Sequence, residues 1–261
     1  MKIEIASGQI QGQREYQQDV YAYREINDEA KLFVLADGMG GYKGGEIASE
    51  LVLKTFMNER GYFVHKEALT SILEQANDKI KTYKEVRPDV CQMGTTLIAL
   101  LVEKEKYYWV SVGDSPLYSI QDNQIERINQ NHSVAGLLDL QVKQGEISAK
   151  EAKEDKNRHL LTSALMGEKI PMIDVSKTFN IKGNEVLLLA SDGIETLSEE
   201  EILETVNHYK DNLEKAVEKL LHQVEKKRKS HQDNTTVLML SFTSKEKKNH
   251  SFIQWIKRII K

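Results

Sequence analysis

The chain has 261 residues, of which 40% are hydrophobic and 29% are charged, and its formal net charge is −4 with a pI of about 6.0. This composition is typical of folded globular proteins, and the slightly acidic balance argues against the basic surface that a nucleic-acid-binding protein needs. The length suffices for one large domain or two small ones.

Cysteine usage and hydropathy predict a cytoplasmic protein. The single cysteine, Cys91, excludes an internal disulfide framework and suits a reducing cytosol. The N-terminal sequence MKIEIASGQI has no apolar signal core, and no apolar run reaches the roughly 20 residues that span a bilayer. Because no Pro-, Gly- or Ser-rich linker interrupts the chain, we expect one domain over residues 1–243 and a short tail over residues 244–261.

The first half of the chain predicts strands, then two helices, then strands again. The expected elements are strands at 2–9, 20–26 and 31–37, helices at 45–60 and 65–84, and strands at 95–102 and 106–112. The strand segments are rich in Val, Ile, Tyr and Thr and are bounded by Gly, Asp or Asn. In the helical segments, apolar residues recur three and four positions apart.

The second half begins with strands joined by tight turns, since residues 113–116 and 122–123 are turn formers. We place the polar segment 141–159 at the surface as a mobile excursion. The last expected elements are a strand at 185–191, a helix that starts at Ser198 with a capping box, a helix at 211–229 and a strand at 235–242. Because the strands come in hairpin-like runs, the pattern predicts an α+β fold of antiparallel sheets with helices outside.

Five aspartates stand at the ends of apolar strands. They are Asp37 in VLADGMGG, Asp114 in WVSVGDS, Asp192 in LLLASDG, Asp233 before the last strand and Asp19 before the second. Carboxylates that meet at one sheet edge repel one another, and a divalent cation relieves the repulsion. Oxygen ligands suit Mg²⁺ or Mn²⁺. The glycines after Asp37 would turn the chain and leave space above the ion for water and a phosphate.

Other interpretations of these segments have to be weighed. A single Asp-Gly pair after a strand is most often a simple turn, so the residues alone leave both the turn and the metal cluster open. The sequence lacks a phosphate-binding P-loop and a dinucleotide-binding glycine pattern, so a nucleotide cradle at residues 37–45 is a poor fit. Cys91 is not part of a C-x-x-x-x-x-R loop, which argues against a cysteine nucleophile; we expect it to be buried or half-buried.

Six short motifs together resemble a known family. They are R-x-x-x-x-D at 14–19, DGMGG at 37–41, GTT at 94–96, GDS at 113–115, SDG at 191–193 and DNTT at 233–236. In this order they resemble the metal-dependent protein phosphatases, the PPM or type 2C family, in its bacterial form. The resemblance extends over residues 8–242. It implies a four-layer α-β-β-α sandwich of two central antiparallel sheets flanked by helices.

The resemblance also implies an activity and a site. The expected activity is hydrolysis of phosphoserine and phosphothreonine in proteins by water activated at two Mg²⁺ or Mn²⁺ ions, opposing a Ser/Thr kinase. The implied residues are Asp37 bridging both ions, the carbonyl of Gly38 on one ion, Asp192 and Asp233 on the other, Asp19 through water, Asp114 with Asp192 at a looser third ion, and Arg14 on the substrate phosphate. Arg14, Asp19 and Asp37 would be the catalytic residues. The alternative is a non-catalytic phosphoprotein-binding regulatory module of the same fold.

The sequence departs from the family pattern at several positions. Pro116 follows GDS, where the family commonly has Arg, and Met39 replaces the His of eukaryotic members. Residues 129–167 resemble the family's flap, but Asp155 and Lys156 stand in place of its usual His-Pro. We therefore do not carry substrate preference over from the family. His132, His159 and His231 are expected at the surface or around the site, because hard-metal sites of this kind use carboxylates.

The tail, residues 244–261, differs from the rest of the chain. Its sequence SKEKKNHSFIQWIKRIIK would form a helix with an apolar side and a basic side. One interpretation is a helix packed on the domain or on a partner; the other is weak attachment to an anionic membrane surface, at the inner face of the membrane.

Overall fold

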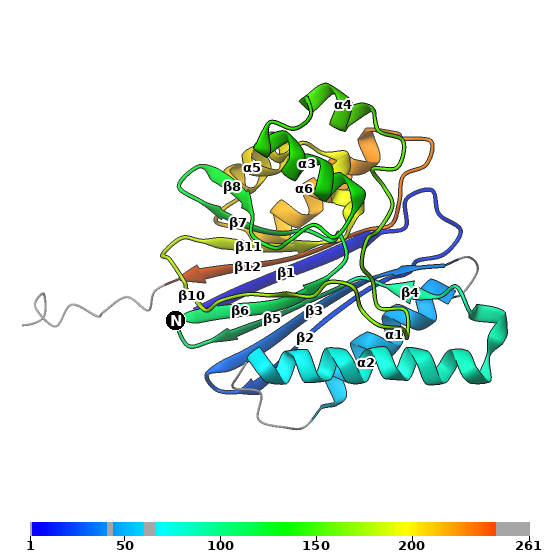
Figure 1. Cartoon of the computed structure of the whole chain (residues 1–261). Coiled ribbons are helices and arrows are strands. Elements are labelled where there is room, and N and C mark those ends of the chain that lie inside the picture. Colours follow the sequence, from blue (N-terminus) through cyan, green and yellow to red (C-terminus); the bar gives the residue numbers. More distant parts are fainter. Residues whose placement is uncertain (1, 41–43, 60–65, 244–261) are drawn as a thin grey trace, which may run out of the picture.

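The computed structural model describes residues 2–40, 44–59 and 66–243, which form two antiparallel sheets packed face to face with helices on both outer sides (Figure 1). The expected four-layer α+β sandwich is confirmed. The tail over residues 244–261 lies outside the described residues. No helix in the described part of the chain combines the length and the apolar character needed to cross a membrane.

One sheet has seven strands and the other has five. The order of the first is β10 (Phe179–Asn180), β6 (Lys106–Val112), β5 (Leu97–Glu103), β3 (Ala30–Met39) and β2 (Asp19–Asn27), with β4 (Gly94–Thr95) beside β3 and β9 (Asp174–Val175) beside β6. The order of the second is β1 (Lys2–Ile10), β12 (Thr235–Thr243), β11 (Val186–Ala190), β7 (Leu117–Gln121) and β8 (Gln124–Arg127).

Four of the helices in the described part of the chain pack on the outer faces of the sheets: α1 (Gly44–Asn58), α2 (Lys66–Val86), α5 (Glu199–His208) and α6 (Leu213–Lys226). Helices α3 (Val134–Gln144) and α4 (Ala149–Glu154) pack against each other, and short 3₁₀ turns lie at η1 (Pro88–Val90) and η2 (Asp192–Thr196). In Figure 1, α1 and α2 lie against the seven-stranded sheet, and α5 and α6 against the five-stranded sheet.

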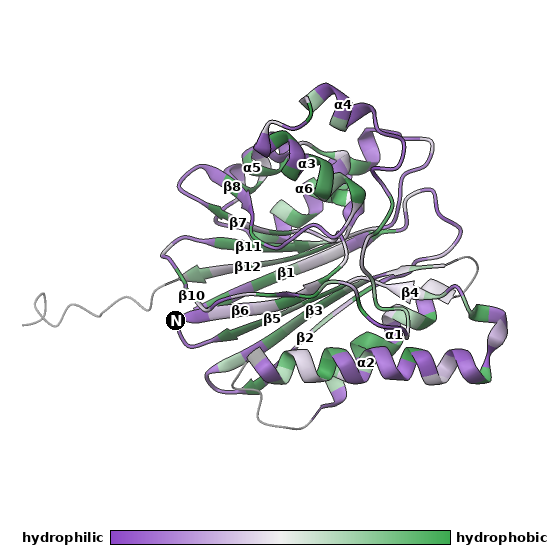
Figure 2. Cartoon of the chain, viewed as in Figure 1, coloured by the Kyte–Doolittle hydropathy of each residue, from purple (hydrophilic) through white to green (hydrophobic). Residues whose placement is uncertain are grey.

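Side chains of the central strands are buried on both faces. Along β3, Phe33 and Leu35 enter the layer between the sheets, while Leu32 and Val34 pack against α1 and α2. This alternation follows from the two-residue period of a strand. Figure 2 shows the result as hydrophobic strands in the middle of the molecule and hydrophilic residues along the outer side of α2. Strands buried in this way have continuous apolar sequences, which explains why they were readily predicted.

The seven predicted strands and four predicted helices are all present, with three differences. The segment expected as one strand at 95–102 is interrupted at Thr96, which separates β4 from β5. Strands β6 and β7 belong to different sheets, so residues 113–116 cross from one sheet to the other. The segment 141–159, expected as a mobile excursion, contains the end of α3 and all of α4. The missed signals are local: Ser133 caps the start of α3, and Gly145 ends it with a φ of 77°.

The topology brings several strand ends to one edge of the sandwich. Asp19 at the start of β2 and Asp37 near the end of β3 are Cα partners. Likewise, Ala190 at the end of β11 is the partner of Val237 near the start of β12. Residues far apart in sequence therefore meet at this edge.

Candidate active site

The five aspartates predicted as a cluster come together at this edge. Asp192 opens η2 directly after β11, Asp233 precedes β12, and Asp114 lies in the crossing between β6 and β7. Burial raises the pKa of Asp37 well above its ordinary value, and the charges of the other four aspartates raise it further. Hydrogen bonds and strand pairing connect the segments that carry them: Asp19 is the strand partner of Asp37, and Ser191, next to Asp192, donates to Asp19 Oδ2.

Asp192 and Asp114 show the same effect. Burial is the main cause that raises the pKa of Asp192 well above its ordinary value, with the charge of Asp114 next. Burial also raises the pKa of Asp114, but the nearby positive charge of Arg127 opposes that rise. The site thus holds more negative charge than its surroundings compensate.

Asp19 is the most buried of the five, with 2% of its surface exposed. Its Oδ2 accepts hydrogen bonds from Ser191 Oγ at 2.7 Å and Thr236 Oγ1 at 2.8 Å. Burial raises the pKa of Asp19 to about 6, although these hydrogen bonds lower it. Its Oδ1 and the Oδ1 of Asp192 are buried and have no hydrogen-bond partner among the described residues. Buried polar atoms normally have a partner, so these two oxygens indicate a ligand or ordered water.

The main chain of Asp37 is held by the GTT motif. Asp37 N–H donates to Thr96 Oγ1 at 3.1 Å, and the carbonyl of Asp37 accepts from Thr96 N–H and Thr95 Oγ1, both at 2.9 Å. The Oγ atoms of Thr96 and Ser115 lie 2.7 Å apart and share a hydrogen bond. Thr96 therefore connects the Asp37 strand to the loop of Asp114. The sequence singled out GTT only as a motif and did not assign this role.

Gly38 follows Asp37 where the chain comes very close to another segment. A Cβ atom at Gly38 would lie 2.2 Å from the carbonyl oxygen of Gly45 and 2.8 Å from that of Gln18. No side chain fits there. Glycine is therefore required at this position because two other stretches of backbone pack directly against it.

Arg14 lies beside Asp233. Its Nη2 is 2.5 Å from Asp233 Oδ2, and 55% of the Arg14 side chain is exposed. The surrounding loop is organised by Asn234, whose Nδ2 donates to the carbonyls of Gln11 and Tyr16 and whose Oδ1 accepts from Gln18 N–H. Asn234 is a second residue whose function sequence reasoning did not identify, although it belongs to the DNTT motif.

The donor atoms fit a hard divalent cation in their chemistry. They are carboxylate and carbonyl oxygens, two of them buried without a partner, in a site with excess negative charge. Across residues 2–40, 44–59 and 66–243, no three His, Cys, Asp or Glu side chains are already arranged around one ion. Asp19 is held by Ser191 and Thr236, and Asp233 by Arg14, so these carboxylates face protein donors.

His132, His159, His231 and Cys91 occupy different environments. His132 is buried, contrary to one reading of the sequence, and its Nδ1 accepts from the N–H of Gly113 at 3.2 Å. Burial lowers the pKa of His132, and the hydrogen bond that Nδ1 accepts connects the ring to the loop of Asp114. His159 and His231 are exposed. Cys91 is also exposed, which corrects the expectation of a buried or half-buried side chain; it follows the 3₁₀ turn η1 as its C-terminal cap.

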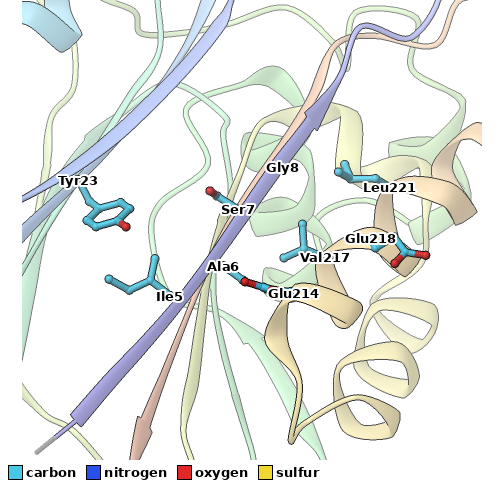
Figure 3. A pocket seen from close by; sticks show the side chains of 9 residues that line it. All are labelled: Ile5, Ala6, Ser7, Gly8, Tyr23, Glu214, Val217, Glu218 and Leu221. Atoms are coloured by element: carbon cyan, nitrogen blue, oxygen red, sulfur yellow. The ribbon is translucent and has the colours of Figure 1, made fainter.

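One hollow lies beside the η2 segment of the cluster, and another lies elsewhere on the molecule. A groove of about 1120 Å³ runs between α3, α4 and the side chains of Arg127 and Glu195, and Glu195 shares η2 with Asp192. A pocket of about 410 Å³ lies between β1 and α6, with Tyr23 across from them (Figure 3). None of the five aspartates lines this second pocket, so it is not part of the candidate site.

The sequence and the structure of this chain are similar to those of known phosphatases. A sequence model of the family described as Protein phosphatase 2C matches residues 10–238. The serine/threonine phosphatase stp of Listeria welshimeri is 28% identical over 236 residues, which cover 87% of this chain and 90% of that protein. The crystal structure of the serine/threonine phosphatase Stp1 from Staphylococcus aureus matches with a TM-score of 0.81 at 25% identity, covering 94% of this chain and 96% of that one. The catalytic domain of PstP in complex with two manganese ions matches with a TM-score of 0.75 at 27% identity, covering 93% and 99%.

Proposed function

This chain belongs to the protein phosphatase 2C family, and from that membership we propose how its own residues act. It is a metal-dependent serine/threonine protein phosphatase that uses Mn²⁺ or Mg²⁺ and hydrolyses phosphoserine and phosphothreonine in proteins. The assignment of roles depends above all on one observation: Asp19 is the strand partner of Asp37, and its carboxylate accepts hydrogen bonds from Ser191, next to Asp192, and from Thr236 of the DNTT motif that contains Asp233. This grouping, with Arg14 beside it, argues against a non-catalytic binding module.

The aspartates would hold the ions. Asp37 would bridge two ions, the Gly38 carbonyl would bind one of them, and Asp192 and Asp233 the other. Asp19 would reach the ions through water, which its unpartnered buried Oδ1 supports. Asp114 and Asp192 would hold a looser third ion, which their close electrostatic interaction supports. When bound, the ions lower the pKa of water and offset the charge of the phosphoryl group.

Two side chains would act on the reactants directly. Arg14 is exposed at the edge of the cluster, and its planar guanidinium offers several donors to phosphate oxygens. Its contact with Asp233 keeps the guanidinium next to the site. Asp19 Oδ1 would accept a hydrogen bond from the attacking water and orient it, because Oδ2 is already occupied by Ser191 and Thr236.

These roles are tested with p-nitrophenyl phosphate and purified protein. Asp37→Asn and Asp192→Asn should each keep less than about a tenth of the wild-type rate, because a lost ligand costs several kcal/mol of transition-state stabilisation. EDTA should have the same effect on the wild type. Asp78→Asn, an exposed carboxylate on α2, is the matched control and should keep full activity. Either site variant with more than a tenth of the rate would contradict its assigned role.

The proposal extends to the substrates of the domain and to the role of residues 244–261. The substrates would be cytoplasmic phosphoproteins of a cognate Ser/Thr kinase, acted on by a catalytic domain over residues 1–243. Residues 244–261, outside the described part, would give weak contact with an anionic membrane surface or a partner. Truncation after Ser244 should then abolish sedimentation with anionic liposomes while turnover of p-nitrophenyl phosphate is kept. Equal sedimentation of both forms would exclude the membrane contact.

A further inference from the structure

Arg127, the last residue of β8, extends its side chain under the loop that carries Asp114. Only 15% of the side chain is exposed. Its Nη2 donates to the carbonyl oxygen of Asp114 at 2.6 Å and, more weakly, to that of Ser115 at 3.4 Å. Its Nη1 donates to Glu195 Oε1 at 3.1 Å, and its Nε to Asn129 Oδ1 at 3.3 Å. All three nitrogens of the guanidinium are therefore engaged.

These contacts join two segments that are distant in sequence. Asp114 lies in the crossing from the seven-stranded sheet to the five-stranded sheet, and Glu195 lies in η2, which begins with Asp192. One cation thus ties together the segment that carries Asp114 and the segment that begins with Asp192. A guanidinium suits this task because its donors are fixed in one plane and its charge does not titrate.

The rest of the crossing is held by different contacts. Gly113 has a φ of 103°; its N–H donates to Nδ1 of His132, and its carbonyl oxygen accepts from the main-chain N–H of His132. The side chain of Ser115 is bonded to Thr96. The residues on both sides of Asp114 are thereby anchored, and Arg127 anchors the main chain of Asp114 itself.

We propose that Arg127 is a positioning residue that holds Asp114 and Asp192 at the correct separation for the most weakly bound ion of this phosphatase. The inference rests on the proposed function, in which these two aspartates share that ion. Arg127 does not touch the ion or the substrate; it acts through the main chain of Asp114 and through Glu195. A purely structural Arg127 would instead support the fold without any selective effect on ion binding.

The test compares Arg127→Gln and Arg127→Lys with Arg158→Gln. Arg158 lines the same groove and donates to the carbonyl oxygen of Ala152 and to Oδ1 of Asp139, and its hydrogen-bond partners among the described residues do not include the Asp114 loop. Mn²⁺ binding is followed by isothermal titration calorimetry, without substrate, and turnover of p-nitrophenyl phosphate is measured against Mn²⁺ concentration. Circular dichroism confirms that each variant is folded.

We expect Arg127→Gln to weaken the lowest-affinity Mn²⁺ site about tenfold or more, while the tighter sites change less than about twofold. Half-maximal turnover should move to higher Mn²⁺ by a similar factor, Arg127→Lys should restore part of the affinity, and Arg158→Gln should match the wild type. An unchanged isotherm, or equal weakening of every site, would overturn the positioning role. Absence of Mn²⁺ binding by the wild type would instead refute the proposed function.

Discussion

The ionised carboxylate of Asp19 would serve the reaction, but its burial makes the folded protein less stable. Removing the charge therefore tests both effects. The pKa of this buried carboxyl is raised from 3.8 to about 6. One pH unit corresponds to about 1.4 kcal/mol, so keeping Asp19 ionised above pH 6 costs about 3 kcal/mol of folding free energy. Asp19→Asn removes the charge at nearly constant shape, and its amide oxygen can still accept from Ser191 and Thr236. In EDTA at pH 7.5, the variant should be about 1 to 3 kcal/mol more stable than the wild type, since hydrogen bonds to a neutral acceptor are weaker.

The raised pKa of Asp19 also determines how the folding stability of the wild type changes with pH. Because the folded protein binds the proton more tightly than the unfolded chain, wild-type stability falls as pH rises from about 4 to about 6. The advantage of Asp19→Asn should therefore shrink to about 1 kcal/mol or less at pH 4.5. Urea denaturation in EDTA at both pH values measures it, with Asp78→Asn as the control. If Asp19→Asn is no more stable than the wild type at pH 7.5, the charge of Asp19 does not destabilise the folded protein and the explanation is refuted. Turnover of p-nitrophenyl phosphate by Asp19→Asn should fall whether or not its stability rises.

Three other changes test neighbouring contacts. Thr96→Val keeps the shape of the side chain but leaves Asp37 N–H and Ser115 Oγ without their hydrogen-bond partner. Urea denaturation should therefore show a loss of about 1 to 3 kcal/mol in the free energy of unfolding, and an unchanged value would contradict the stabilising role of these hydrogen bonds. Arg14→Ala should lower kcat/KM for p-nitrophenyl phosphate about tenfold or more, with partial recovery in Arg14→Lys, and an unchanged value would remove Arg14 from phosphate binding. Adding Mn²⁺ to EDTA-treated wild type should raise its Tm with concentration, whereas Asp37→Asn should show a much smaller rise.

Local sequence patterns were sufficient for most of the elements and for the chemistry of the site. The continuous apolar run of β3, the capping box at Ser198 and the turn at Asp122 and Asn123, both with positive φ, act within a few residues, so they can be read directly. The carboxylates at strand ends indicated a hard-metal site for the same reason. Helix α4 and the end of α3 were missed because the composition of residues 141–159 is polar and resembles that of a loop, even though Ser133 and Gly145 marked the bounds of α3.

The tertiary structure alone decided which residues meet. Asp19 is the register partner of Asp37, and Asn234 reaches Gln18 across 216 positions, because antiparallel pairing and sheet packing bring strand ends together. The same packing sends β6 and β7 to different sheets and places Arg127 under Asp114. Such contacts depend on the burial of whole faces, which no short window of sequence contains. The amino-acid sequence thus determined the elements and the acidic groups, and their assembly into one charged centre came from long-range packing.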